Sequence, residues 1–237
     1  MTRPLIGITI DSHDDGDKYE SPMSYARAVE LAGGLPFLLP YMTDVSLIPQ
    51  YVDALDGILF AGGNDLDPAV YGQSWHPKAE PIDPARQKFE TALIAEVEKR
   101  KLPALGDCLG SQLMNVYRGG SLHQFLPDVD RAAAIEHRRV GEQSSRHAVS
   151  VDTSSKLGHA IGAANVSVNT FHKQSASKLG RGLKVIATAP DGVIEGFEDP
   201  SFPLFAAVQW HPERLVEEPE HLGVFKLLVE TARDKQK

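Results

Sequence analysis

The chain has 237 residues, of which 42% are hydrophobic and 24% charged, with a net charge of −8 at pH 7. This composition excludes a disordered, collagen-like or coiled-coil chain, and its acidic balance argues against a nucleic-acid binder, which needs a basic surface. The apolar stretches are too short to cross a membrane and the acidic N-terminal stretch is unlike a signal peptide, so we expect a cytoplasmic protein that partners neither nucleic acid nor membrane.

The first half of the chain alternates apolar strand-like runs with helical segments. The expected strands are Leu5–Ile10, Leu35–Leu39, Leu55–Phe60 and Leu102–Gly106. The expected helices are Met23–Leu31, Val45–Ala54, a segment that follows Asp83, and Gly110–Tyr117. Asp83 can cap the third helix and Pro84 occupies a favoured first position. Phe89, Leu93 and Val97 then fall on one face of that helix.

The second half is richer in short strand-like runs, and one more helix closes the chain. The runs are His147–Val151, Val166–Asn169, Leu183–Ala189, Val193–Phe197 and Leu204–Trp210. Strands that alternate with helices form parallel sheets. We therefore expect one α/β domain over residues 1–237, a doubly wound and mostly parallel sheet flanked by helices, with antiparallel additions in the second half.

Three unusual sequences follow predicted strands. They are AGGND from Ala61, GDCLGSQ from Gly106 and QWHPE from Gln209. Functional sites of open α/β sheets lie at the carboxyl ends of the strands. The three sequences are therefore expected to meet in one site.

Cys108 is the candidate nucleophile of that site. Gly106 and Gly110 flank it between a strand and a helix, which is the layout of a nucleophile elbow. A helix N-terminus favours the thiolate, and the backbone N–H of Leu109 would point toward an oxyanion formed beside the sulfur. The alternative is that Cys108 is only a small buried hydrophobic residue.

His211 and Glu213 are the candidate acid–base pair. Positions i and i+2 of an extended segment face the same side, and Pro212 favours an extended conformation at His211. The carboxylate could then orient the imidazole and stabilise its charged form. The alternative is a surface turn with an incidental ion pair.

The Gly62-Gly63 pair could be a simple turn. Glycine at a strand end also lets a backbone N–H approach a ligand closely. A donor from Gly63 together with that of Leu109 would form a two-donor oxyanion hole, and Asp65 would make the loop rigid.

GDCLGSQ and QWHPE together resemble the class I glutamine amidotransferase superfamily, which has a flavodoxin-like fold and a Cys-His-Glu triad. Five further segments resemble the γ-glutamyl-γ-aminobutyrate hydrolase family, a branch of the C26 peptidases that acts in polyamine breakdown. They are AGGLPFLLP from Ala32, AGGNDLDP from Ala61, NVYRGGSLHQ from Asn115, NTFHKQ from Asn169 and APDGVIEGFE from Ala189. The resemblance extends from Leu5 to the last helix.

The resemblance implies roles for individual residues. It makes Cys108 the nucleophile, His211 the base and acid, and Glu213 the orienting partner, with Gly63 and Leu109 as the oxyanion donors. It also implies candidate substrate-binding residues, namely Gly62, Asp65, Gln112 and His172, of which Gln112 could equally serve helix packing. The expected reaction is hydrolysis of a γ-glutamyl amide, through a γ-glutamyl thioester, to glutamate and a free amine.

Two residues depart from the family pattern. Leu109 stands where the hydrolase branch has Arg, and leucine there is common in glutaminases. Asp107 stands where relatives have an apolar residue, and its charge would disfavour the thiolate if the side chains approached. Strand alternation is expected to direct Asp107 away from Cys108.

Two other functions remain open from the sequence. One is a glutaminase subunit that supplies ammonia to a partner synthase, and the other is a non-enzymatic ligand-binding or regulatory relative. The expected partner is a small γ-glutamyl substrate, and a homo-oligomer is left open. No organic cofactor is expected, and because the nine histidines lack the short paired spacings of metal sites, no metal is expected either.

Overall fold

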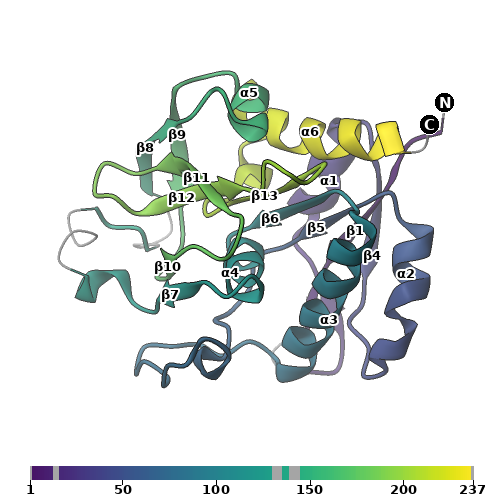
Figure 1. The fold of residues 1–237 in the computed structure, drawn as a ribbon, viewed down its shortest axis with the longest axis horizontal. Coiled ribbons are helices and arrows are strands. Elements are labelled where there is room, and N and C mark those ends of the chain that lie inside the picture. Colours follow the sequence, from purple (N-terminus) through teal and green to yellow (C-terminus); the bar gives the residue numbers. More distant parts are fainter. Residues whose placement is uncertain (1, 13–15, 130–134, 139–144, 236–237) are drawn as a thin grey trace.

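The computed structural model describes residues 2–12, 16–129, 135–138 and 145–235. A nine-stranded sheet forms its centre (Figure 1). In spatial order the strands are β4 (Leu35–Leu39), β1 (Leu5–Thr9), β5 (Gly57–Phe60), β6 (Ala104–Asp107), β13 (Phe205–Val208), β12 (Ile194–Glu198), β11 (Lys184–Thr188), β8 (Ser145–Val151) and β9 (Asn165–Thr170). Two small sheets pair β10 (Ser175–Lys178) with β7 (Ser121–His123), and β2 (Asp11–Ser12) with β3 (Tyr19–Glu20).

The sheet has a parallel half and an antiparallel half. From β4 through β1, β5 and β6 to β13, every neighbouring pair is parallel. From β13 through β12, β11 and β8 to β9, every pair is antiparallel. The predicted fold class, a parallel sheet with antiparallel additions from the second half of the chain, is therefore confirmed.

Helices cover both faces of the sheet (Figure 1). One face carries α1 (Met23–Leu31), α5 (Lys156–Ile161) and α6 (Pro219–Lys235), and the other carries α2 (Ile48–Ala54), α3 (Pro84–Arg100) and α4 (Leu109–Tyr117). Strand alternation divides the core accordingly. Leu59 and Leu105 belong to the apolar cluster under α1 and α6, whereas Ile58, Phe60 and Ala104 belong to the cluster under α2, α3 and α4.

The third helix forms as its sequence signals predict. The carboxylate of Asp83 accepts a hydrogen bond from the backbone N–H of Ala85 at 2.8 Å, and Pro84 is the first helical residue. Phe89, Leu93 and Val97 are all buried. By contrast, α5 and the short strands of the two small sheets were not predicted from the sequence.

The strand order places the site. β5, β6 and β13 are neighbours in the sheet, although the segments that follow them are far apart in the chain. Because the three strands are parallel, their carboxyl ends meet at one edge.

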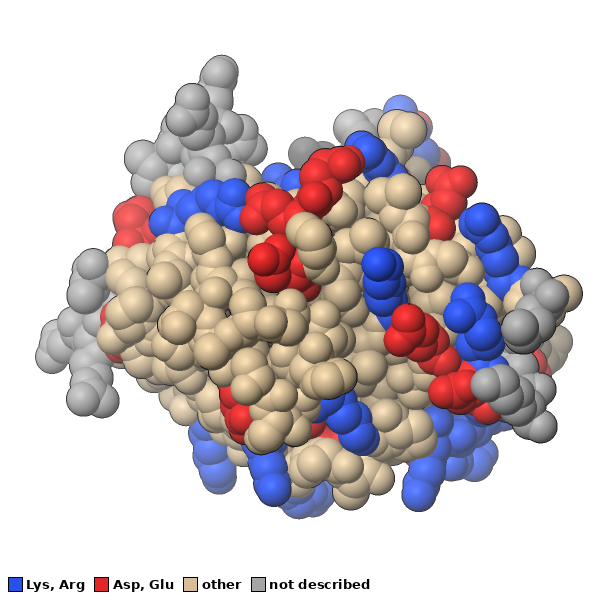
Figure 2. Space-filling model, turned by 90° about the horizontal axis from the view of Figure 1, so that it is seen from above, with Lys and Arg blue, Asp and Glu red and all other residues tan. Residues whose placement is uncertain are grey.

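The surface mixes charges of both signs. On the face shown in Figure 2, acidic and basic side chains are interspersed around uncharged residues. Among the described residues, no helix is both long enough and apolar enough to span a bilayer.

Candidate active site

Cys108 occupies a sharp turn between β6 and α4. Its φ is +51°, a left-handed value that side-chain-bearing residues rarely adopt and that marks local strain. A Cβ on Gly106 would lie 2.7 Å from the carbonyl carbon of Gly110, and a Cβ on Gly110 would lie 2.1 Å from the carbonyl oxygen of Phe60. Only glycine fits at both flanking positions, so this segment has the geometry of a nucleophile elbow.

His211 follows β13 and contacts Glu213. Its Nδ1 lies 3.0 Å from Oε1 of Glu213, and both residues are buried. The side chain of Asn169 holds the backbone of His211 from both sides, accepting from its N–H at 2.9 Å and donating to its C=O at 2.8 Å. The segment is not extended as predicted, because Pro212–Arg214 forms a 3₁₀ turn that folds the carboxylate back toward the ring.

His211 also contacts Cys108, which brings the three predicted catalytic residues together. A Cβ built on Gly62 would lie 3.1 Å from Cε1 of His211 and 3.7 Å from Cβ of Cys108. Burial disfavours the imidazolium, but a hydrogen bond and the charge of Cys108, together with Glu213, outweigh burial and raise the pKa of His211 to about 10. The arrangement therefore favours the protonated form of His211.

The two predicted oxyanion donors are free to bind a ligand. Neither the N–H of Gly63 nor that of Leu109 has a hydrogen-bond partner within the described part of the chain. The N–H of Gly62, in contrast, donates to the hydroxyl oxygen of Tyr25 at 2.9 Å. This hydrogen bond holds the backbone of Gly62 in place, next to the unpaired N–H group of Gly63.

Arg86 anchors this loop, and its role was not predicted from the sequence. Its fully buried guanidinium donates to the carbonyl oxygen of Gly62 at 2.9 Å, to Asp11 at 2.6 Å and to Glu90 at 2.8 Å. The Gly62 carbonyl and the Gly63 N–H belong to one planar peptide unit and point in opposite directions. By holding this carbonyl, Arg86 therefore helps to orient the N–H of Gly63. The sequence feature that could have revealed this role is the position of Arg86, a charged residue on the same apolar face of the helix as Phe89.

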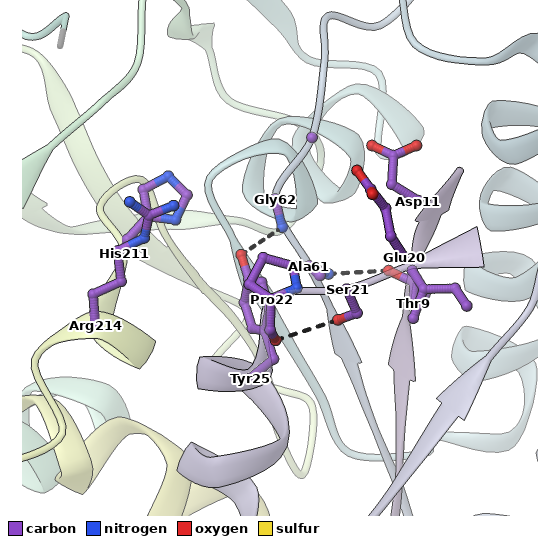
Figure 3. Close-up of a pocket in the computed structure, with 12 residues that line it drawn as sticks. Thr9, Asp11, Glu20, Ser21, Pro22, Tyr25, Ala61, Gly62, His211 and Arg214 are labelled. Carbon is purple, nitrogen blue, oxygen red and sulfur yellow. Dashed lines mark hydrogen bonds between the residues drawn. The ribbon is translucent and has the colours of Figure 1, made fainter. Parts of the chain in front are cut away.

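Two cavities adjoin the triad. One, of about 360 Å³, is here called the thiol-side cavity, and the other, of about 210 Å³, is called the imidazole-side cavity. The thiol-side cavity is lined by Gly63, Asn64, Asp65, Glu80, Cys108, Gln112, Arg138, Phe171, His172, Lys173 and Gln174. The imidazole-side cavity is lined by Thr9, Ile10, Asp11, Glu20, Ser21, Pro22, Tyr25, Ala61, Gly62, Gly63, His211 and Arg214 (Figure 3).

The predicted substrate-binding residues lie around these cavities. Asp65 accepts from the N–H of Glu80 at 2.7 Å and pairs with Lys173 at 3.1 Å. The Gln112 amide donates weakly, at 3.3–3.4 Å, to Gln209 and to the carbonyl of Gln174. His172 also lines the thiol-side cavity, but its side chain is only 1% exposed and its Nε2 lies 3.5 Å from Glu195.

Asp107 is not directed away from the catalytic residues, contrary to expectation. It is fully buried, and neither carboxyl oxygen has a hydrogen-bond partner within the described ranges. Burial, followed by the charge of Glu213, raises the pKa of Asp107 well above its usual value. Alternation does place Asp107 on the α1 face of the sheet with Leu105. On that face, however, Asp107 interacts electrostatically with both Tyr25 and Glu213.

Asp107→Asn is expected to stabilise the protein at pH 8. The raised pKa means that the folded state keeps a proton that the unfolded chain releases, so stability is lost as the pH rises above the ordinary carboxyl value. Removing the titration should raise Tm at pH 8 by about 2–4 °C for each kcal/mol recovered. Calorimetry at pH 8 and pH 4 checks this: the gain should vanish at pH 4, and an equal gain at both values would contradict it.

The amino-acid sequence of the chain is similar to those of known proteins. The sequence model of the family Peptidase C26 matches residues 4–213. Rv2859c of Mycobacterium tuberculosis, provisionally described as a glutamine amidotransferase, is 38% identical over 238 residues, covering 98% of this chain and 75% of that protein. The γ-glutamyl-γ-aminobutyrate hydrolase PuuD of Escherichia coli (strain K12) is 32% identical over 228 residues, covering 90% of this chain and 87% of the relative.

Solved structures show the same fold. A Thermoplasma acidophilum protein, provisionally described as one of the subunits of GMP synthase, matches with a TM-score of 0.71 and 17% identity, covering 100% of this chain and 97% of that one. The glutaminase domain of Trypanosoma brucei CTPS, with bound acivicin, matches with a TM-score of 0.67 and 15% identity, covering 98% and 94% of the two chains.

Proposed function

Because the chain belongs to the peptidase C26 family, we propose that it hydrolyses a γ-glutamyl amide, with Cys108 as nucleophile, His211 as base and acid, and Glu213 as orienting partner. The observation that carries this proposal is the meeting of three strand ends, which brings the thiol, the imidazole and two unpaired backbone N–H groups to one edge of the sheet. The hydrolase among the relatives supports amide hydrolysis as the reaction class.

Acylation begins with transfer of the thiol proton from Cys108 to His211. The sulfur then attacks the γ-carbonyl carbon, and the C=O electron pair moves onto oxygen. The N–H groups of Gly63 and Leu109 would hold this oxyanion, and a donor in such a site contributes about 3 kcal/mol. The C–N bond then breaks, and His211 gives its proton to the departing amine.

Deacylation reverses these roles. His211, now neutral, takes a proton from water, and the resulting hydroxide attacks the γ-glutamyl thioester. The C–S bond breaks, glutamate is released, and the returning proton restores the thiol of Cys108.

The two cavities suggest how the substrate is divided. His211 must protonate the leaving nitrogen, so we assign the amine half to the imidazole-side cavity, which His211 lines. The glutamyl half, which carries both an ammonium and a carboxylate group, suits the thiol-side cavity. That cavity offers acidic Asp65 and Glu80 beside basic Lys173.

Arg214 would recognise a carboxylate on the amine half. In Figure 3 it lies beside His211 on one side of the cavity, opposite Asp11 and Glu20. This supports γ-aminobutyrate as the leaving amine, and with it a role in the breakdown of polyamines such as putrescine. A free catalytic thiol also suits the reducing cytoplasm, which we propose as its location.

Arg214→Gln is expected to lower kcat/KM for γ-glutamyl-γ-aminobutyrate by roughly 10–100-fold, the worth of one charge-assisted hydrogen bond. For γ-glutamyl-p-nitroanilide, which has no carboxylate on the amine half, the same variant should lose no more than about threefold in kcat/KM relative to the parent protein. Because Arg214 also lies 3.4 Å from Glu213, the ratio between the two substrates is the readout. An unchanged ratio would exclude recognition by Arg214.

The function itself is tested by trapping the intermediate. Rapid quenching of the protein with γ-glutamyl amides, followed by mass spectrometry, should reveal one glutamyl group on the peptide that contains Cys108. Glutamate and amine should appear in equal amounts. Finding no acyl-enzyme and no amine release across the panel would reject the proposal.

A second candidate is a glutaminase that supplies ammonia to a partner. The 38% identical relative is described as an amidotransferase, and Leu109 fits that group. The triad chemistry would be the same, so substrate choice separates the two. Turnover of glutamine alone, and only with a partner protein added, would favour the glutaminase.

A further inference from the structure

A second cluster of reactive side chains lies outside the triad. His137, His147, His172 and Glu195 come from four separate segments, and their side chains are 1%, 6%, 1% and 0% exposed. One potential ligand atom from each lies within 4.8 Å of all the others. The cluster belongs to the antiparallel half of the sheet, where β8, β12 and the end of β9 lie together away from α2 and α3 (Figure 1).

The distances inside the cluster are wrong for hydrogen bonds. Oε1 of Glu195 lies 3.4 Å from His137 Nδ1, 3.4 Å from His147 Nε2 and 3.5 Å from His172 Nε2. A charge-assisted N–H···O⁻ bond would be about 2.7–2.9 Å. These three nitrogens and both oxygens of Glu195 have no hydrogen-bond partner among the residues that the structure describes.

The same distances fit a tetrahedral metal site. A zinc ion with bonds of about 2.0–2.1 Å separates its ligand atoms by about 3.3–3.4 Å, the edge of the tetrahedron. The three N···O separations lie close to this value.

The outer nitrogens of the three rings are already occupied. His172 Nδ1 lies 2.9 Å from the carbonyl oxygen of Gln174, and His147 Nδ1 lies 3.1 Å from that of Ala148. His137 Nε2 lies 2.8 Å from a carboxylate oxygen of Asp191. These oxygens can only accept, so each outer nitrogen carries a hydrogen and each neutral ring presents a lone pair to the cluster.

Three lone pairs and a carboxylate then converge on one buried point, where a single metal cation would satisfy all four groups. Outer-nitrogen donation to a carbonyl or carboxylate is also the usual support of a metal-binding histidine. We propose that His137, His147, His172 and Glu195 bind a divalent transition metal, with zinc as the ion that best fits three imidazoles and one carboxylate. The expectation of no metal, drawn from sequence spacing, is the one that this proposal replaces.

The site would be structural. Four protein ligands complete a tetrahedron and leave no open position for substrate. The metal would instead fix the segment 171–174, which lines the thiol-side cavity. In that segment the ring of Phe171 meets His211 edge-on at 5.7 Å, and Lys173 pairs with Asp65 at 3.1 Å.

Metal content tests the proposal without reference to activity. The untagged chain should carry Cys108→Ala, because a thiolate beside an imidazole can itself bind zinc. After loading with zinc and desalting, mass spectrometry of the metal should find about one ion per chain. Adding His147→Ala or Glu195→Gln should reduce this below about 0.1 per chain. His159→Ala, which removes an exposed histidine outside the cluster, should retain the full ion.

A thermal measurement keeps the test decisive if a variant folds poorly. Chelator-treated protein should gain Tm when zinc is added, because a ligand that binds only the folded state stabilises it. The His159→Ala protein should gain equally, and the Glu195→Gln protein should not gain. Less than about 0.1 zinc per chain in the loaded parent protein, or full zinc in Glu195→Gln, would overturn the proposal.

Discussion

Replacing Cys108 with alanine is expected to reduce kcat for γ-glutamyl amides by roughly 10⁴-fold or more, the size of loss that follows removal of a catalytic nucleophile. Without the sulfur no thioester can form, so direct attack by water would have to replace both steps. Stopped assays with product quantified by mass spectrometry have the range to measure this. Hydrolysis within tenfold of the parent protein would reject Cys108 as the nucleophile.

A second readout of the same variant separates chemistry from folding. Alanine retains the Cβ, so the strain of the left-handed turn at φ +51° is the same in both proteins. The charge and hydrogen bond of Cys108 help to raise the pKa of His211 to about 10. In Cys108→Ala that pKa should fall, and NMR titration of the His211 ring measures the fall in a protein shown to be folded by circular dichroism.

Much of the fold follows from local sequence patterns. Short apolar runs predicted β1, β4 and β5, of which the last two adjoin glycine pairs, and the Asp83-Pro84 signal predicted the start of α3. The short strands β7 and β10 could not be predicted, because three or four residues carry too little periodicity. Their pairing depends on contacts between distant segments.

The candidate site shows the same division. The glycines around Cys108 predicted an elbow because no other residue fits there. Arg86 was missed because the role of an arginine on an apolar helix face is recognisable only when its acceptors, here Glu90, Asp11 and the carbonyls of Ala61 and Gly62, are known. The histidine–glutamate cluster was missed because its members come from four segments with no fixed spacing.

The surroundings of a strand side chain could not be predicted from alternation alone. Alternation was expected to direct Asp107 away from Cys108, and this was wrong, because the sequence did not reveal that the chain folds back after His211 and brings Glu213 toward the region of Asp107. A one-turn 3₁₀ segment replaced the expected extension. Local geometry of this kind depends on Asn169, which holds the backbone of His211 from the neighbouring antiparallel half of the sheet.

Glu213→Gln is expected to lower kcat by roughly 10³–10⁴-fold, as loss of the orienting carboxylate does in comparable triads. Oε1 of Glu213 lies 3.0 Å from His211 Nδ1 and fixes which ring nitrogen carries the hydrogen. An amide could instead donate to Nδ1 and stabilise the wrong tautomer. Its lack of charge would also lower the pKa of His211, which Glu213 helps to raise to about 10.

The matched control is Glu217→Gln, which changes an exposed carboxylate paired with Arg27 and should leave kcat within about twofold, since surface ion pairs contribute little. Steady-state kinetics across pH should show the loss in Glu213→Gln mainly in kcat rather than KM, because the carboxylate acts on the imidazole and not on the bound substrate. A rise in KM alone, with kcat and the His211 titration unchanged, would assign Glu213 to the pocket wall instead of the triad.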